Sequence, residues 1–377
     1  MTIAISSSFD GGNIEVVRCE SPEDIELRIP RDTHSDFLQW FYFRLTGAAD
    51  QACTIRITGL KESAYPAGWP GYRACVSEDR EIWWRTDTAY DEQAGTLTIH
   101  VTPGSGSIYL AYFAPYSMER HHDLIADMSG VVGVEIESLG KTLDGQDIDL
   151  ITMGTGPLNI WMIGRQHPGE TMAEWWMEGA LDMLTDHANP VARKLLEVAT
   201  LRIVPNMNPD GSRRGNLRVN GAGANLNREW AEPALDRSPE VYHVRAKMDE
   251  TGCDFCLDVH GDEAIANNFI AGPEGTPSFS RRQQELLDGW KAALLERSPD
   301  FQTEEGYPVD KSGQANLAIC TNQIAERFGC LSMTLEMPFK DANVMPDEMM
   351  GWSPERCGEL ARACLGATLA MTARLQA

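Results

Sequence analysis

Two histidines and one glutamate are placed where a metal site could form. His167 and Glu170 are separated by Pro168 and Gly169 in a short loop, and His260 follows far along the chain. Two imidazoles and one carboxylate are the ligand set of a catalytic zinc ion that keeps one position open for water. A structural zinc site more often has four ligands that are rich in cysteine. The three residues are therefore compatible with a catalytic zinc site.

Each histidine also has an ordinary explanation. His167 could be an exposed loop residue, and His260 could be a hydrogen-bonded histidine of the core. The chain has only eight histidines, and the other six occupy less suggestive positions. His121 and His122, for example, stand beside acidic residues, which is typical of a solvated helix face.

An arginine-rich loop is the second candidate for chemistry. A turn at 208–211 is followed by Arg213, Arg214 and Arg218, and then by the sequence Asn-Leu-Asn-Arg-Glu-Trp at 225–230. The guanidinium of arginine fits a carboxylate in a bidentate manner, and a neighbouring asparagine adds a neutral donor. Such enrichment in a strongly acidic chain is typical of a carboxylate-binding site. A solvated loop with internal ion pairs would also explain Arg213 and Arg214.

The elements that must position these residues are mostly apolar strands. We expect four of them, at 158–164, 201–204, 255–259 and 331–335. Polar residues follow each strand in turn: His167 and Glu170, Asn208 and Asp210, His260, and Glu336. Helical periodicity lies between and after the strands, so we predict an open, mixed α/β sheet with flanking helices. Sites in such sheets form at the carboxyl ends of the strands.

The first 118 residues have a different pattern. Apolar and polar residues alternate at 39–45, 53–57 and 96–101, and Gly/Pro-rich turns separate these segments. The pattern predicts a small β-sandwich. We therefore expect two domains, a β-sandwich at 1–118 and a catalytic domain at 119–377.

Composition excludes several classes of protein. The chain has 377 residues and a formal net charge of −24, so nucleic acid and anionic membrane surfaces are unfavourable partners. No apolar run approaches the roughly 18 residues of a membrane span, and the N-terminus lacks the pattern of a secretory signal. Nine irregularly spaced cysteines predict reduced thiols and a cytoplasmic protein. Cys253 and Cys256 form one CxxC pair, for which core packing is the favoured interpretation over a redox or zinc role.

Six ordered motifs of the second half carry a resemblance to a known family. They are His-Pro-Gly-Glu at 167–170, Asn-Pro-Asp-Gly at 208–211, Gly-Asn-Leu-Arg at 215–218, the 225–230 segment, Asp-Val-His-Gly at 258–261 and Thr-Leu-Glu at 334–336. The chain resembles the zinc metallocarboxypeptidases of the carboxypeptidase A type, and within them the cytosolic carboxypeptidase subfamily. Segments 39–43 and 112–117 resemble the β-domain of that subfamily, so the likeness spans nearly the whole chain.

The resemblance implies an activity and a role for each matching residue. The activity is hydrolysis of the C-terminal residue of peptides or proteins, with one zinc ion per chain. His167, Glu170 and His260 match the zinc ligands, and Glu336 matches the general base that activates the attacking water. Arg218 matches the residue that stabilises the oxyanion. Asn227 and Arg228 match the pair that binds the substrate's terminal carboxylate.

One feature departs from the family pattern. Carboxypeptidases of this type usually have a mobile tyrosine upstream of the base, but no tyrosine lies between Tyr307 and Glu336. Tyr307 is the candidate to replace it, although a Tyr-Pro turn packed at the surface explains this residue equally well.

Other functions stay open at the level of sequence. A fold-mate that deacylates small N-acyl amino acids would share the zinc ligands without needing the whole Asn-Arg loop. A catalytically silent peptide-binding protein should have lost a ligand or the base, and all four are present. The residue preferred at the substrate C-terminus is not specified, although Arg165, Lys311, Arg327 or Lys340 could bind an acidic side chain. A homo-oligomer is also compatible with the sequence.

Overall fold

The N-terminal part of the chain is an all-β sandwich. The computed structural model describes residues 2–376. One five-stranded sheet has the order β1 (Ala4–Ser6), β4 (Tyr42–Thr46), β10 (Ser107–Ala111), β6 (Cys75–Ser77) and β7 (Trp84–Arg85). The other has the order β2 (Glu15–Ser21), β3 (Asp24–Arg28), β5 (Cys53–Thr58), β9 (Thr96–Val101) and β8 (Asp87–Asp91). Short 3₁₀ turns occupy Leu60–Glu62 and Pro66–Gly68.

The alternation in sequence explains why these strands form. In β5, Ile55 and Ile57 are fully buried and lie opposite Ile99 and Leu97 of β9. Polar residues between them face the other side, as the twofold period of a strand requires. The predicted strands at 53–57 and 96–101 are confirmed, whereas the predicted strand at 39–45 begins only at Tyr42.

The second part is built on a mixed sheet, as predicted, and this sheet has seven strands. The order is β11 (Val134–Lys141), β12 (Asp147–Met153), β14 (Ala199–Val204), β13 (Leu158–Gly164), β15 (Phe255–Asp262), β17 (Leu331–Pro338) and β16 (Phe269–Ala271). The four central strands run parallel, and β12 and β16 pair antiparallel with the outer two of them. At the edge, β11 pairs antiparallel with β12. The four predicted strands are these four central ones.

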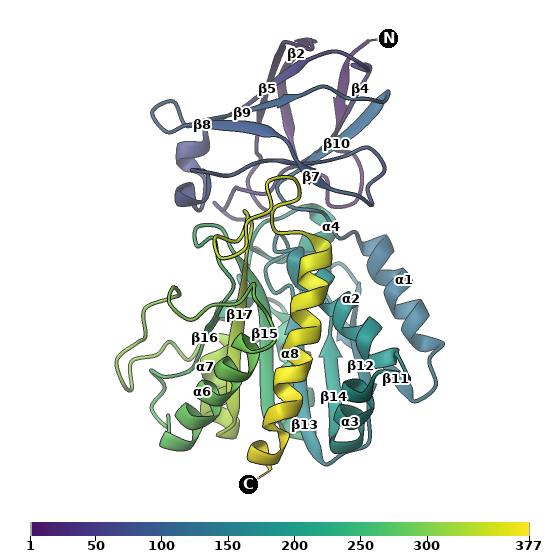
Figure 1. The fold of residues 1–377 in the computed structure, drawn as a ribbon. Coiled ribbons are helices and arrows are strands. Elements are labelled where there is room, and N and C mark those ends of the chain that lie inside the picture. Colours follow the sequence, from purple (N-terminus) through teal and green to yellow (C-terminus); the bar gives the residue numbers. More distant parts are fainter. Residues whose placement is uncertain (1, 377) are drawn as a thin grey trace.

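Helices cover both faces of this sheet (Figure 1). The helices are α1 (Met118–Ser129), α2 (Met172–Thr185), α3 (Pro190–Val198), α4 (Pro209–Arg214), α5 (Pro239–Thr251), α6 (Arg281–Leu295), α7 (Cys320–Phe328) and α8 (Pro354–Leu375). In β13, Ile160 and Met162 pack into the core that includes α2 and α8, while Trp161 and Ile163 pack into the core that includes α5 and α7. Both faces of the strand are thus buried, which explains its continuous apolar sequence.

A buried arginine connects the β-sandwich to the second part. Arg85 on β7 is 5% exposed and has no carboxylate partner among the described residues. Its Nη2 donates to the carbonyl oxygens of Phe339, Lys340 and Trp352, and its Nη1 donates to that of Arg73. Phe339, Lys340 and Trp352 lie in the segment between β17 and α8, which reaches the sandwich in Figure 1. The guanidinium therefore satisfies the buried carbonyls of Phe339 and Trp352, for which the structure shows no other donor among the described residues.

None of the described helices combines the length and apolar character that crossing a membrane requires.

Candidate active site

The candidate metal ligands meet at the carboxyl ends of the central strands. The loop after β13 carries His167 and Glu170 and leads into α2. His260 lies near the end of β15, directly opposite Glu336 on the parallel strand β17. Adjacent parallel strands therefore bring two residues that are far apart in sequence to one edge, where sites of open α/β sheets are found.

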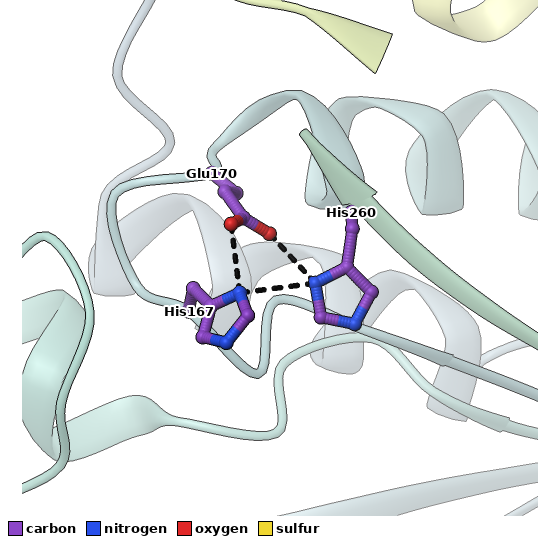
Figure 2. Close-up of side chains that lie close together, drawn as sticks. All are labelled: His167, Glu170 and His260. Carbon is purple, nitrogen blue, oxygen red and sulfur yellow. Dashed lines mark hydrogen bonds and ion pairs between the residues drawn. The ribbon is translucent and has the colours of Figure 1, made fainter. Parts of the chain in front are cut away.

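Three ligand atoms converge at this edge. Figure 2 shows His167, Glu170 and His260 turned toward one another. His167 Nδ1 lies 2.7 Å from Glu170 Oε1, and His260 Nδ1 lies 2.8 Å from Glu170 Oε2. The two Nδ1 atoms are 3.1 Å apart. All three side chains are buried, and one ligand atom from each could hold a single metal ion.

The hydrogen bonds of the two histidine Nε2 atoms indicate which ring nitrogens could bind a cation. His260 Nε2 lies 2.9 Å from Asp258 Oδ2, and His167 Nε2 lies 3.1 Å from Asn225 Oδ1. Both oxygens are acceptors, so each Nε2 carries the proton in the neutral ring and each Nδ1 presents a lone pair. In the neutral rings, two lone pairs and a carboxylate face one another, an arrangement that is repulsive unless a proton or a cation lies between them. This donor set fits a divalent cation such as zinc.

The pKa values of the three candidate ligands reflect the carboxylates that surround them. Burial alone would lower the pKa of His260, but Asp258 and Glu170 raise it well above its ordinary value. Burial, together with nearby Arg218, lowers the pKa of His167 to about 4. Burial acts to raise the pKa of Glu170, yet the two histidines lower it overall, so this ligand is a carboxylate.

A buried charge network holds the loop that carries two of the ligands. Arg165, with a positive φ of 57°, donates to Glu174 Oε2 at 2.5 Å and to the carbonyl of Pro168 at 3.0 Å. The other oxygen of Glu174 is 2.6 Å from His121 Nδ1, and His121 Nε2 is 3.2 Å from Asp149. The prediction of a solvated face was therefore wrong for His121, which is 1% exposed because its helix packs this side chain between two carboxylates.

Glu336 has the surroundings of a general base. It is 6% exposed, and its Oε2 has no hydrogen-bond partner among the described residues. Burial raises its pKa well above the ordinary value, although His260 acts in the opposite direction. The hydroxyl of Tyr307 lies 3.2 Å from its Oε1, so the structure brings the candidate tyrosine to the base rather than to a remote surface turn.

The arginine-rich loop contributes three residues to the same place. A cavity of about 470 Å³ is lined by His167 and Glu336 and also by Arg218, Asn227 and Arg228. Arg218 Nη1 lies 3.4 Å from Glu170 Oε1. The structure therefore brings together all seven residues that the sequence assigned to the site.

The position of the Asn-Arg pair suits a carboxylate. Asn227 Oδ1 accepts a 2.8 Å hydrogen bond from Cys320 N, and its amide nitrogen has no partner among the described residues. Arg228 Nη1 donates to the carbonyl of Asn227 at 2.6 Å, which leaves other donors of the guanidinium available. Two free donor groups at one end of a cavity can bind the two oxygens of a terminal carboxylate.

Other polar residues of the candidate loops are structural. Asn208 caps α4 by accepting from Gly211 N, and Asp210 accepts from Thr142 and from Asp144 N. Arg214 pairs with Asp144 rather than with Asp210. These side chains hold the loop and do not line the cavity.

Sequence reasoning missed contributions from the β-sandwich. Tyr65 lines the cavity, and the buried Asp32 accepts hydrogen bonds from the backbone of the Arg218 loop. No local signal could have identified either residue, because both act through contacts between distant parts of the chain. The CxxC cysteines, by contrast, are buried in a core cluster, as expected.

The comparisons with known proteins cover both parts of the chain. Residues 5–113 match the family model for the cytosolic carboxypeptidase N-terminal domain, and residues 132–350 match that for zinc carboxypeptidase. An uncharacterised protein of Zymomonas mobilis is 59% identical over 97% of this chain and 95% of its own length. Human cytosolic carboxypeptidase 1 is 27% identical over 72% of this chain, which corresponds to 26% of the human protein.

Solved structures of bacterial enzymes share the whole fold. A metallo-carboxypeptidase from Burkholderia cenocepacia has a TM-score of 0.95 at 47% identity, covering 98% of this chain and 99% of its own. A metallo-carboxypeptidase from Pseudomonas aeruginosa, in complex with (2-guanidinoethylmercapto)succinic acid, has a TM-score of 0.96 at 41% identity, covering 99% and 100%. With its converging His-Glu-His set and the carboxylate at the neighbouring strand end, this chain belongs to the zinc carboxypeptidase family and carries the N-terminal domain of the cytosolic carboxypeptidases.

Proposed function

We propose that the seven residues around the cavity form the machinery of a carboxypeptidase that removes the C-terminal residue from peptides or proteins. His167, Glu170 and His260 are the zinc ligands in this proposal. One observation carries it: the base, the oxyanion arginine and the Asn-Arg pair line the same 470 Å³ cavity as a metal ligand. Separate binding and structural roles would not require these groups to share one cavity.

The Asn-Arg pair determines where the substrate is cut. Asn227 and Arg228 bind the terminal carboxylate, which fixes the last peptide bond beside Glu336. An internal peptide bond would bring no carboxylate to this pair and would leave charged donors unpaired, which is a costly state. The Asn-Arg pair therefore explains a preference for the last peptide bond over internal bonds.

The reaction is general-base-assisted hydrolysis of that bond. A zinc ion held by His167, Glu170 and His260 would lower the pKa of a water and polarise the substrate carbonyl. Glu336 accepts a proton from the attacking water and delivers it to the nitrogen of the leaving amino acid. Arg218 stabilises the negative charge that develops on the carbonyl oxygen. Tyr307, whose hydroxyl reaches Glu336, is the candidate for the family's mobile tyrosine.

The charge of the cavity bears on the preferred side chain. None of the four cations considered from the sequence lines the cavity: Arg165 pairs with Glu174, Arg327 pairs with Asp249, Lys340 donates to the carbonyl of Pro70, and Lys311 is exposed. Seven carboxylates and three cations line it, and two of these cations are Arg218 and Arg228. We therefore expect no preference for a C-terminal glutamate.

We also propose the wider context of the enzyme. A cytoplasmic location is supported by nine free cysteines, eight of them buried, and by the subfamily of the N-terminal domain. Two domains, at 1–118 and 119–377, are supported by the end of β10 at Ala111 and the start of α1 at Met118.

The test is cleavage of matched peptides by the zinc-loaded enzyme. Peptides that end in Ala, Lys or Glu are offered with a free or an amidated C-terminus, and single amino acids released are quantified. We expect release from free ends only, with Glu-ended peptides no better than the others. Equal cleavage of free and amidated peptides would contradict binding of the terminal carboxylate by the Asn-Arg pair. Hydrolysis confined to small N-acyl amino acids would favour a deacylase instead.

A further inference from the structure

The loop that carries Arg218 is held by a carboxylate of the β-sandwich. Asp32 is 4% exposed and accepts three backbone hydrogen bonds, from Leu217 at 2.7 Å, Arg218 at 2.7 Å and Val219 at 3.3 Å. Next to it, Thr33 donates from both its backbone nitrogen and its hydroxyl to Asn216 Oδ1, each at 3.2 Å. The backbone of Arg218 is therefore fixed from a segment about 185 residues earlier in the chain.

A tyrosine of the same β-sandwich flanks the side chain of Arg218. The guanidinium carbon lies 5.4 Å from the centre of the Tyr65 ring, within the range of a cation–π contact. Tyr65 is itself held by the fully buried Gln39, which accepts from its backbone nitrogen at 2.9 Å and donates to its carbonyl at 3.1 Å. Gln39 thus fixes the backbone of Tyr65, and the ring of Tyr65 limits where the guanidinium can lie.

The orientation of Arg218 matters because a competing partner is close. Its Nη1 is 3.4 Å from Glu170, and its Nε is buried without a hydrogen-bond partner among the described residues. A loosened loop would let the guanidinium form a full ion pair with Glu170. That pair would withdraw the arginine from the oxyanion and would weaken a metal ligand at the same time.

We propose that the β-sandwich is part of the catalytic apparatus, with Asp32 and Tyr65 as positioning residues for Arg218. The proposal rests on the role of Arg218 in the proposed function and extends it to a domain that contributes none of the three candidate metal ligands. Asp32 fixes the backbone of the loop, and Tyr65 restricts the side chain. Neither residue needs to touch the scissile bond.

A double-mutant cycle tests whether Asp32 acts through Arg218. Asp32→Asn places an amide N–H₂ against backbone donors, so it should disturb the loop with little change in volume. We expect kcat to fall about 10-fold or more, toward the roughly 10²–10³-fold loss that follows removal of an oxyanion donor. Affinity for a phosphonate peptide that mimics the transition state should fall with kcat, while KM changes little. In the Arg218→Ala background, Asp32→Asn should cause almost no further loss.

Matched variants separate positioning from stability. Asp10 is also a side-chain carboxylate near the start of the chain. It accepts one backbone hydrogen bond, from Met118 at 2.6 Å, but it does not line the cavity. Asp10→Asn should leave kcat and phosphonate affinity at wild-type values. Tyr65→Phe keeps the ring and should lose much less kcat and phosphonate affinity than Tyr65→Leu does. This pair of variants decides the question if Asp32→Asn fails to fold.

Two results would overturn the proposal in different ways. A multiplicative loss of kcat on adding Asp32→Asn to Arg218→Ala would mean that Asp32 acts independently of the arginine. An unchanged kcat in the Arg218→Ala variant would mean that Arg218 has no catalytic role. Cleavage of free C-termini by the wild-type enzyme would still support the carboxypeptidase function.

Discussion

The hydroxyl of Tyr307 lies 3.2 Å from Oε1 of Glu336 and 2.7 Å from Oδ2 of Asp262, so one phenol contacts two carboxylates at the edge of the cavity. Its ring packs edge-on against Phe269 at 4.9 Å between centroids. Burial raises the pKa of Tyr307 far above its ordinary value, and the charge of Glu336 adds to this effect. The phenol therefore stays protonated and donates hydrogen bonds to these carboxylates.

Removal of this hydroxyl should weaken catalysis without abolishing it. A hydrogen bond to a charged group contributes about 1.5–3 kcal/mol, which corresponds to roughly a 10–100-fold loss of kcat/KM in Tyr307→Phe. Steady-state kinetics on one peptide with a free C-terminus measures the effect. Unchanged kinetics would make Tyr307 a packing residue of the cavity wall.

Glu336→Gln should have a much larger effect because it removes the proton acceptor while keeping the shape of the side chain. We expect kcat to fall by several orders of magnitude, with peptide binding and zinc content preserved. Steady-state kinetics, calorimetric binding of an uncleaved peptide and metal analysis of the same sample test all three points. A normal kcat in this variant would refute the proposed mechanism.

Arg228→Ala should affect KM more than kcat, because the Asn-Arg pair binds the substrate and does not transfer protons. Loss of a charge-assisted contact to the terminal carboxylate costs on the order of 2–5 kcal/mol if the pair is desolvated. The loss should appear mainly as a higher KM and a weaker preference for free over amidated C-termini. The matched control is Arg214→Ala, which removes an arginine that pairs with Asp144 outside the cavity and should leave KM unchanged.

The metal content tests the ligand set directly. We expect about one zinc ion per chain in the wild-type protein and its loss in His167→Ala and His260→Ala. Asp258→Asn, which removes the partner of His260 Nε2, should weaken zinc affinity about 10–100-fold. Circular dichroism should show that the fold survives, because a chain of this length has a sufficient core without a metal. Full zinc occupancy in both alanine variants would exclude this site.

The buried His121 should make stability depend on pH. Burial opposes its charge, but Glu174 and Asp149 raise its pKa to about 9 from an ordinary 6.5. Because the pKa is higher in the folded state, the stabilisation is fully present below pH 6.5 and is lost as the pH rises through about 9. The shift corresponds to on the order of 3 kcal/mol.

Urea unfolding of wild type and His121→Gln between pH 6 and 10 measures this contribution. The difference in the free energy of unfolding should be largest near pH 6 and should shrink toward pH 10. His122 is exposed on the same helix, so His122→Gln should reproduce the wild-type pH profile. A constant difference between wild type and His121→Gln across the range would contradict the assignment.

Sequence predicted the parts of this enzyme that depend on local pattern. The apolar strands that lead to His167, His260 and Glu336 are recognisable because both faces of a central strand must be apolar. Short edge strands such as β16 carry too few residues for a pattern, and β11 and β12 alternate weakly at the rim of the sheet. These were missed for that reason.

The contributions of the β-sandwich were missed for another reason. Asp32 and Tyr65 stand in turn-like segments whose composition suggests only loops, and their partners lie in another part of the chain. His121 was assigned to a solvated face because its neighbours in sequence are acidic, whereas the carboxylates that bury it come from α2 and β12. The surroundings of Asp32, Tyr65 and His121 all depend on tertiary contacts, which local sequence does not encode.

The buried Arg85 also constrains the order of events during synthesis. Its carbonyl acceptor on Trp352 is 267 residues further along the chain. A ribosome that adds about 5–20 residues per second supplies this partner roughly 13–53 s after Arg85 itself. Nη2 of Arg85 must therefore remain hydrated for tens of seconds without this acceptor, and the β-sandwich can dock completely only after Trp352 has been made.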